Sequence, residues 1–86
     1  MPNADGIDAS DAVAVAHQIV QGTVSPVDGA ERLGWMASEY EMLADALMTF
    51  KGLASAWEDD RDPDHRAAYE QDVVVEADRF MARFGK

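Results

Sequence analysis

Two proline-containing motifs fix where helices can begin in this chain of 86 residues. In the segment 25–28, Ser-Pro-Val-Asp, a hydroxyl stands at the N-cap, a proline at the first helical position and a carboxylate at the third. Proline has no N–H group to satisfy there, and the serine and aspartate side chains can accept hydrogen bonds from free backbone N–H groups. The segment 62–64, Asp-Pro-Asp, repeats the arrangement. The motifs therefore predict helices that start at residues 26 and 63.

Apolar residues recur at helical spacing along most of the chain. The clearest stripe, with steps of four, three, four and three residues, contains Leu43, Leu47, Phe50, Ala54 and Trp57. No stretch alternates polar and apolar residues over the length of a strand. We therefore predict an all-α protein without a sheet, a small four-helix bundle whose helices cover residues 9–21, 26–38, 41–58 and 63–84.

The first helix is expected to begin at a cap formed by Asp8 or Ser10 and to end at Gly22, because glycine adopts the left-handed conformation of a helix C-terminus. Residues 1–8 are expected to be a flexible terminus, and residues 9–86 a single domain. The buried face of this helix is predicted from helical spacing and includes a partly buried histidine; it consists of Val13, Ala16, His17, Ile19 and Val20.

The middle of the chain leaves two points open. Helices two and three could run on as one, but we expect a break at residues 38–41, because the chain must fold back to bury both apolar stripes. Gly29 and Gly34 lie inside the second helix, where each costs about 1 kcal/mol relative to alanine. We interpret them as places where another backbone passes close, in preference to a break. The expected core is Leu33, Leu43, Leu47, Phe50, Trp57, Tyr69 and Phe80.

Composition narrows the classes of function. The chain has 17 acids against 7 bases, a net charge of −10 and no cysteine. An acidic surface repels phosphate backbones and anionic membranes, so we expect neither nucleic acid nor membrane as a partner. Without cysteine there is no disulfide framework and no thiol nucleophile. The first residues lack the basic residues and the long apolar run of a signal peptide. We therefore expect a cytoplasmic protein.

No motif points to catalysis, a cofactor or a metal. Asp60, Asp62 and Asp64 match the first three ligand positions of a calcium-binding loop, but His65 and Gln71 stand where glycine and glutamate are required. An acidic turn that starts a helix is the preferred interpretation, and metal binding is the alternative. The two histidines lie far apart in sequence and have no nucleophile motif beside them. We therefore expect no enzyme and no catalytic, cofactor or metal site.

The candidate partner-binding residues are a tryptophan off the main apolar stripe and the acids of the segment 58–64. An exposed tryptophan is a common hot spot of protein interfaces, although Trp35 could equally be buried. The acids either keep the protein soluble or steer it toward a basic protein surface. We expect that changing Asp59, Asp60 and Asp62 to asparagine leaves the stability of the fold unchanged or slightly raises it, because this segment concentrates negative charge. The candidate residues are Trp35, Glu58, Asp59, Asp60, Asp62 and Asp64.

These features favour a non-catalytic protein-binding module, in particular an immunity- or antitoxin-like inhibitor of a basic partner. One alternative is a structural homo-oligomer that self-associates through Trp35 and the glycine-bearing face of the second helix. The other is a regulatory domain that binds a metal or another ligand at residues 58–65.

Two segments carry a resemblance to known proteins. The segment 19–33, with the patterns Ile-x-x-Gly and Pro-x-x-Gly-Ala, resembles small acidic helical proteins of bacteria, and residues 50–55 are similar to their next segment. The resemblance covers under a third of the chain and implies a helix, a turn and a second helix, with nothing catalytic. In size, acidity and helical content the chain also resembles the four-helix immunity proteins that neutralise bacterial nuclease toxins. That likeness is architectural and implies no site residues.

Overall fold

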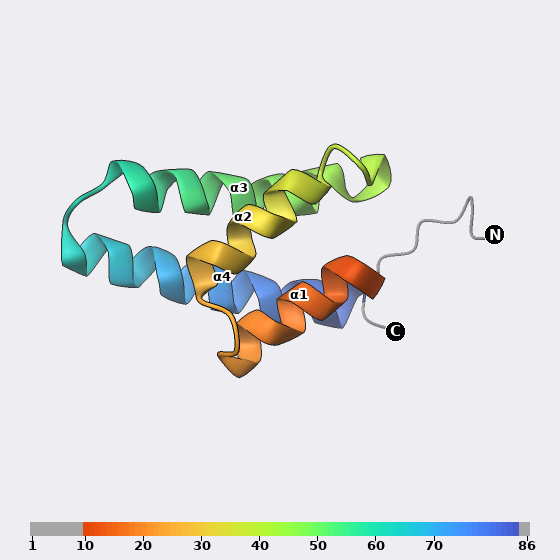
Figure 1. Cartoon of the computed structure of the whole chain (residues 1–86), viewed down its shortest axis with the longest axis horizontal. Helices are drawn as coiled ribbons and strands as arrows, with labels where there is room; N and C mark the ends of the chain where they lie inside the picture. Colours follow the sequence, from red (N-terminus) through yellow and green to blue (C-terminus); the bar gives the residue numbers. More distant parts are fainter. Residues whose placement is uncertain (1–9, 85–86) are drawn as a thin grey trace.

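A computed structural model describes residues 10–84, in which the chain forms a bundle of α-helices (Figure 1). The elements are α1 (Ser10–Gln21), α2 (Pro26–Met36), the short 3-10 helix η1 (Glu41–Leu43), α3 (Ala44–Asp59) and α4 (Pro63–Phe84). α3 and α4 run antiparallel and are joined by a short turn, while α1 packs mainly on α4 and α2 mainly on α3. The residues described include no strand. The predicted all-α, four-helix fold is confirmed.

The predicted helix boundaries rest on the expected caps. Ser25 has extended backbone angles, and its Oγ accepts a hydrogen bond from the Asp28 N–H at 3.2 Å, directly before α2. Ahead of α4, Asp62 Oδ1 accepts the Asp64 N–H at 2.9 Å. Gly22 ends α1 with φ at 82°, as predicted. α1 begins at Ser10, and both Asp8 and the segment 1–8 lie outside the described residues.

The break between the second and third helices is also confirmed. α2 ends at Met36, two residues earlier than predicted, because the backbone tightens into turns there. The N–H groups of Glu39 and Tyr40 both donate to the Met36 carbonyl, at 2.9 and 3.0 Å. The chain then leaves the helical conformation at Tyr40 and starts again through η1. This reversal lets α2 and α3 pack side by side.

The core is formed by all four α-helices, and the Phe50 and Phe80 rings meet edge to face in it, with centroids 6.0 Å apart. Trp57 and Tyr69 are half-buried rather than inside, since each keeps a polar atom bonded at the edge of the core. Trp57 Nε1 donates to Glu70 Oε2 at 2.8 Å. The buried residues are Ala12, Val15, Ala16, Ile19, Val27, Ala30, Leu33, Ala37, Leu43, Leu47, Phe50, Ala54, Val73, Ala77 and Phe80.

The predicted buried face of α1 is wrong by about one residue. His17 is exposed, Val20 is 39% exposed, and Val13 is only half-buried. Ala16 and Ile19 are buried, as predicted, and Ala12 and Val15 take the other inward positions, so the buried face of the helix carries no polar side chain. That choice avoids the cost of burying an imidazole that has no partner. The buried residues of α1 are Ala12, Val15, Ala16 and Ile19.

The two glycines of α2 are points of close packing, as predicted. A Cβ atom on Gly34 would lie 2.8 Å from Lys51 Cβ and 3.2 Å from Lys51 Cα, so α3 passes directly against this residue. A Cβ atom on Gly29 would overlap the Ile19 side chain of α1. Both glycines are therefore buried against neighbouring helices inside the molecule.

Candidate functional site

A depression of about 310 Å³ lies where the first turns of α2, the end of α3 and the middle of α4 meet. Four of its lining residues are acidic and come from three different helices: Asp28 and Glu31 from α2, Glu58 from α3 and Glu70 from α4. We call these four residues the acidic pocket. Its other lining residues are Ser25, Pro26, Val27 and Trp57.

The four acids of the acidic pocket lie together without a lysine or arginine of residues 10–84 that pairs with them. Hydrogen bonding to Glu58 raises the pKa of the Glu31 carboxyl above its ordinary value, and desolvation and the charges of Glu58 and Asp28 add to the effect. Glu31 of α2 and Glu58 of α3 therefore lie within hydrogen-bonding reach of each other.

An exposed apolar patch follows one helical turn further along α2. Trp35 stands four residues after Glu31, so both side chains lie on the same side of the helix. Trp35 is 70% exposed and Met48 of α3 is 48% exposed, on either side of a shallow depression of about 460 Å³. We call this surface the Trp35 patch; it is lined by Gly34, Trp35, Ala37, Ser38, Ala44, Met48 and Lys51.

Both surfaces lie on the seam between α2 and α3, because each is lined by residues of both helices. The structure thus brings together two predicted partner-binding residues, Trp35 and Glu58. Sequence analysis overlooked Asp28, Glu31 and Glu70. The signal for two of them was present, since Asp28, Glu31 and Trp35 follow the spacing of one helix face.

The turn between α3 and α4 uses Asp60 as an internal hydrogen-bond acceptor. Its Oδ1 accepts the Asp62 N–H at 3.0 Å, and its Oδ2 lies 2.8 Å from His65 Nδ1 and 3.5 Å from the Tyr69 hydroxyl. The bond from the Asp62 backbone and the one from His65 lower the pKa of Asp60. The same contact with Asp60, together with its charge, raises the pKa of His65.

The acids of the predicted segment 58–64 therefore have different roles. Asp60 and Asp62 accept backbone hydrogen bonds in the turn and at the start of α4, whereas Asp59, which follows Glu58 of the acidic pocket in the chain, and Asp64 are exposed. Arg66 of α4 binds the end of α3. Its guanidinium lies 4.0 Å from the centre of the Trp57 ring, and its Nε donates to the Trp57 carbonyl at 3.0 Å. Residues 10–84 contain no group of three side chains placed to hold a metal ion.

No protein-family model, curated protein or solved structure matches the chain. The likeness to small helical bacterial proteins and to immunity proteins therefore stays a prediction. Across residues 10–84, no helix combines the length and the apolar character that a membrane crossing requires.

Proposed function

We propose that the protein is a non-catalytic protein-binding module that docks the seam between α2 and α3 onto a basic surface of another protein. The observation that carries this proposal is the close approach of the Glu31 and Glu58 carboxyl groups, with which no lysine or arginine of residues 10–84 forms an ion pair. Two carboxylates held together repel each other, and a lysine or arginine side chain from a partner would remove that repulsion and gain charge-assisted hydrogen bonds.

The Trp35 patch supplies the apolar part of such an interface. Protein interfaces combine a buried aromatic anchor with a polar rim, and truncation of a tryptophan anchor commonly costs about 2 kcal/mol or more. Trp35 and Met48 are exposed next to the acidic pocket, so one partner surface can cover both. The exposed Asp59 and Asp64 extend the negative field and favour fast association with a basic partner.

In its specific form, the proposal is an immunity- or antitoxin-like inhibitor that acts in the cytoplasm on a basic protein. A structural homo-oligomer is the second candidate, which the exposed Trp35 favours. Self-association would bring two copies of net charge −10 together, and that repulsion makes a basic partner the better explanation of the same surface. Gel filtration separates the candidates, because the module is monomeric when it is free and the homo-oligomer is not.

The test couples stability to binding. Wild-type protein on a resin first captures the partner from an extract of the source cells, and the purified partner is then titrated with variants. Glu31→Gln should raise the thermal midpoint at neutral pH, because glutamine can still donate to Glu58 without the charge. It should also weaken partner affinity about tenfold, since the charge pair with the partner is lost.

Trp35→Ala should weaken affinity about thirtyfold or more while the helical content stays unchanged. The matched control is Asp78→Asn, which removes one exposed charge on α4 outside the seam and should leave affinity nearly unchanged. Equal affinities of the wild type, Glu31→Gln and Trp35→Ala for the purified partner would contradict the proposal.

A further inference from the structure

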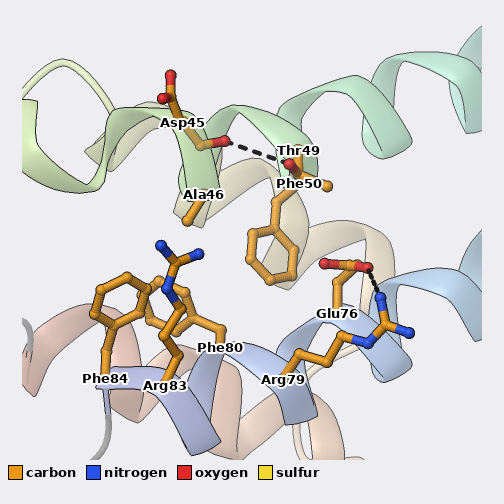
Figure 2. A pocket seen from close by; sticks show the side chains of 9 residues that line it. All are labelled: Asp45, Ala46, Thr49, Phe50, Glu76, Arg79, Phe80, Arg83 and Phe84. Atoms are coloured by element: carbon orange, nitrogen blue, oxygen red, sulfur yellow. Dashed lines mark hydrogen bonds and ion pairs between the residues drawn. The ribbon is translucent and has the colours of Figure 1, made fainter.

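A third depression, of about 440 Å³, lies between the first half of α3 and the second half of α4 (Figure 2). It shares no lining residue with the acidic pocket or the Trp35 patch. Half-buried Phe84 and Ala46 give it an apolar surface, and the buried rings of Phe50 and Phe80 form its floor; the centroids of Phe80 and Phe84 are 4.8 Å apart. We call it the phenylalanine groove. Its volume falls within the range of small-molecule sites.

The charges at the phenylalanine groove differ from those of the rest of the molecule. Two acids, Asp45 and Glu76, and two bases, Arg79 and Arg83, line it, so it is locally neutral in a chain of net charge −10. Arg79 is already held by Glu76, with Nη1 and Oε2 3.1 Å apart. Figure 2 shows the Asp45 carboxylate pointing away from the phenylalanine rings.

Arg83 is the available cation of the groove. Among residues 10–84 no carboxylate forms an ion pair with it, although the chain has 17 acids. Its guanidinium lies 5.1 Å from the centre of the Phe84 ring and, in Figure 2, projects into the space between α3 and α4. A planar guanidinium beside an aromatic surface matches a carboxylate attached to an apolar body.

We propose that the phenylalanine groove binds an apolar carboxylate, a small monoanionic acid whose aliphatic or aromatic body lies against Phe84 and Ala46 between α3 and α4. The Arg83 guanidinium binds the carboxylate of this ligand. The flanking Glu76 and the negative charge of the whole chain disfavour phosphates and other multiply charged anions. A ligand with a single negative charge needs only the Arg83 guanidinium. This site is independent of the proposed docking of a basic protein.

Decanoate is a suitable probe, with decanol as the uncharged control of equal chain length, both kept below the concentration at which micelles form. Decanoate titrated into isotope-labelled protein should bind saturably and shift the NMR signals of residues that line the phenylalanine groove. Decanol should bind about tenfold more weakly. Arg83→Gln should weaken decanoate binding by a similar factor, and the control Arg32→Gln, an exposed arginine on α2, should leave it unchanged.

Four results would overturn the proposal, three of them obtained with the wild-type protein. Decanoate could fail to saturate, its signal shifts could fall outside the groove, or decanol and decanoate could bind wild-type protein equally well. Arg83 is exposed, so its replacement should leave the fold intact, and a circular dichroism spectrum identical to that of the wild type verifies this for each variant. Decanoate affinity unchanged by Arg83→Gln in a folded variant would equally exclude the assigned carboxylate site.

Discussion

Glycine has opposite effects at different positions in these helices. A Cβ atom on Gly52 would meet nothing within 4 Å, so this residue of α3 only adds backbone freedom to the unfolded chain. Gly52→Ala should therefore stabilise the protein by about 1 kcal/mol. Gly29→Ala should destabilise it by a similar amount, because the new methyl group overlaps Ile19 and overpacking costs more than the gain in helix propensity.

Urea unfolding of both variants measures this difference directly. Gly29→Ala and Gly52→Ala make the same chemical change in a helix interior, so each is the control for the other. A Gly29→Ala protein that is as stable as Gly52→Ala would show that α1 and α2 are not in the close contact described.

Asp60 is the residue of the acidic turn whose charge the fold uses. Its lowered pKa means that the ionised form contributes stability above the ordinary value of 3.8 and loses it as the pH falls through the lower folded-state value. The raised pKa of His65 means that its charged form contributes stability below the ordinary value of 6.5 and loses it as the pH rises through the higher folded-state value. The pair should therefore stabilise the turn most between these two ordinary values.

Asp60→Asn should lower the thermal midpoint at about pH 5.5. It should also flatten its dependence on pH on both sides. Asp59→Asn is the matched control, because Asp59 is exposed and no hydrogen bond or ion pair is found for its side chain; its midpoint should stay close to that of the wild type. This differs from the expectation, drawn from the sequence, that replacing Asp59, Asp60 and Asp62 by asparagine leaves stability unchanged or slightly raised. The range from about pH 3 to about pH 8 spans the titration of both groups. Equal thermal midpoints of Asp60→Asn and Asp59→Asn throughout this range would contradict the structural role of Asp60.

At the scale of the element, the start of α2 depends on one side chain. Ser25→Ala removes the acceptor of the Asp28 N–H and should lower the free energy of unfolding by about 1 kcal/mol. Ser55→Ala, an exposed position inside α3, is the control and should be neutral or slightly stabilising. Chemical denaturation of the two variants checks the prediction, and equal stabilities would mean that Pro26 alone defines the start of α2.

The helix boundaries were predictable because caps act locally. Ser25, Gly22 and Asp62 satisfy or redirect backbone groups within a few residues, so their effects can be recognised in the sequence. The buried side of α1 was not predictable in this way. Its apolar residues are spread around the helix, with Val13, Val15 and Val20 at different angles, and the choice between faces depends on packing with distant residues such as Gly29.

At the scale of the whole molecule, the same limit applies to the candidate sites. The acids of the α3–α4 turn could be selected from sequence, because charge is a property of the residue itself, and Trp35 could be selected because it lies off the main apolar stripe; its exposure of 70% follows from the fold. Glu31 meets Glu58 only after α2 and α3 fold together, and a single sequence carries no local signal of that contact. Arg83 is favourable at the C-terminal end of a helix, and its place beside the phenylalanine rings follows from the packing of α4 on α3.

The charge of the molecule is concentrated in a way that affects the rate of binding more than its lifetime. Exposed acids attract a basic surface across a Debye length of about 8–10 Å, before contact is made. Once the complex has formed, the buried Trp35 patch should determine how slowly it dissociates.

Stopped-flow association of the protein with its purified partner, between about 0.05 and 0.5 M salt, tests this account most directly. Wild-type protein should associate more slowly by at least tenfold at the high salt concentration, with a nearly constant dissociation rate. The double variant Glu58→Gln/Asp59→Asn should associate several-fold more slowly at low salt, and the control double variant Asp72→Asn/Asp78→Asn, which removes two exposed charges on α4, should change the rate much less. Association that ignores both salt and the Glu58→Gln/Asp59→Asn change would contradict the proposal that this acidic end guides a basic partner onto the seam between α2 and α3.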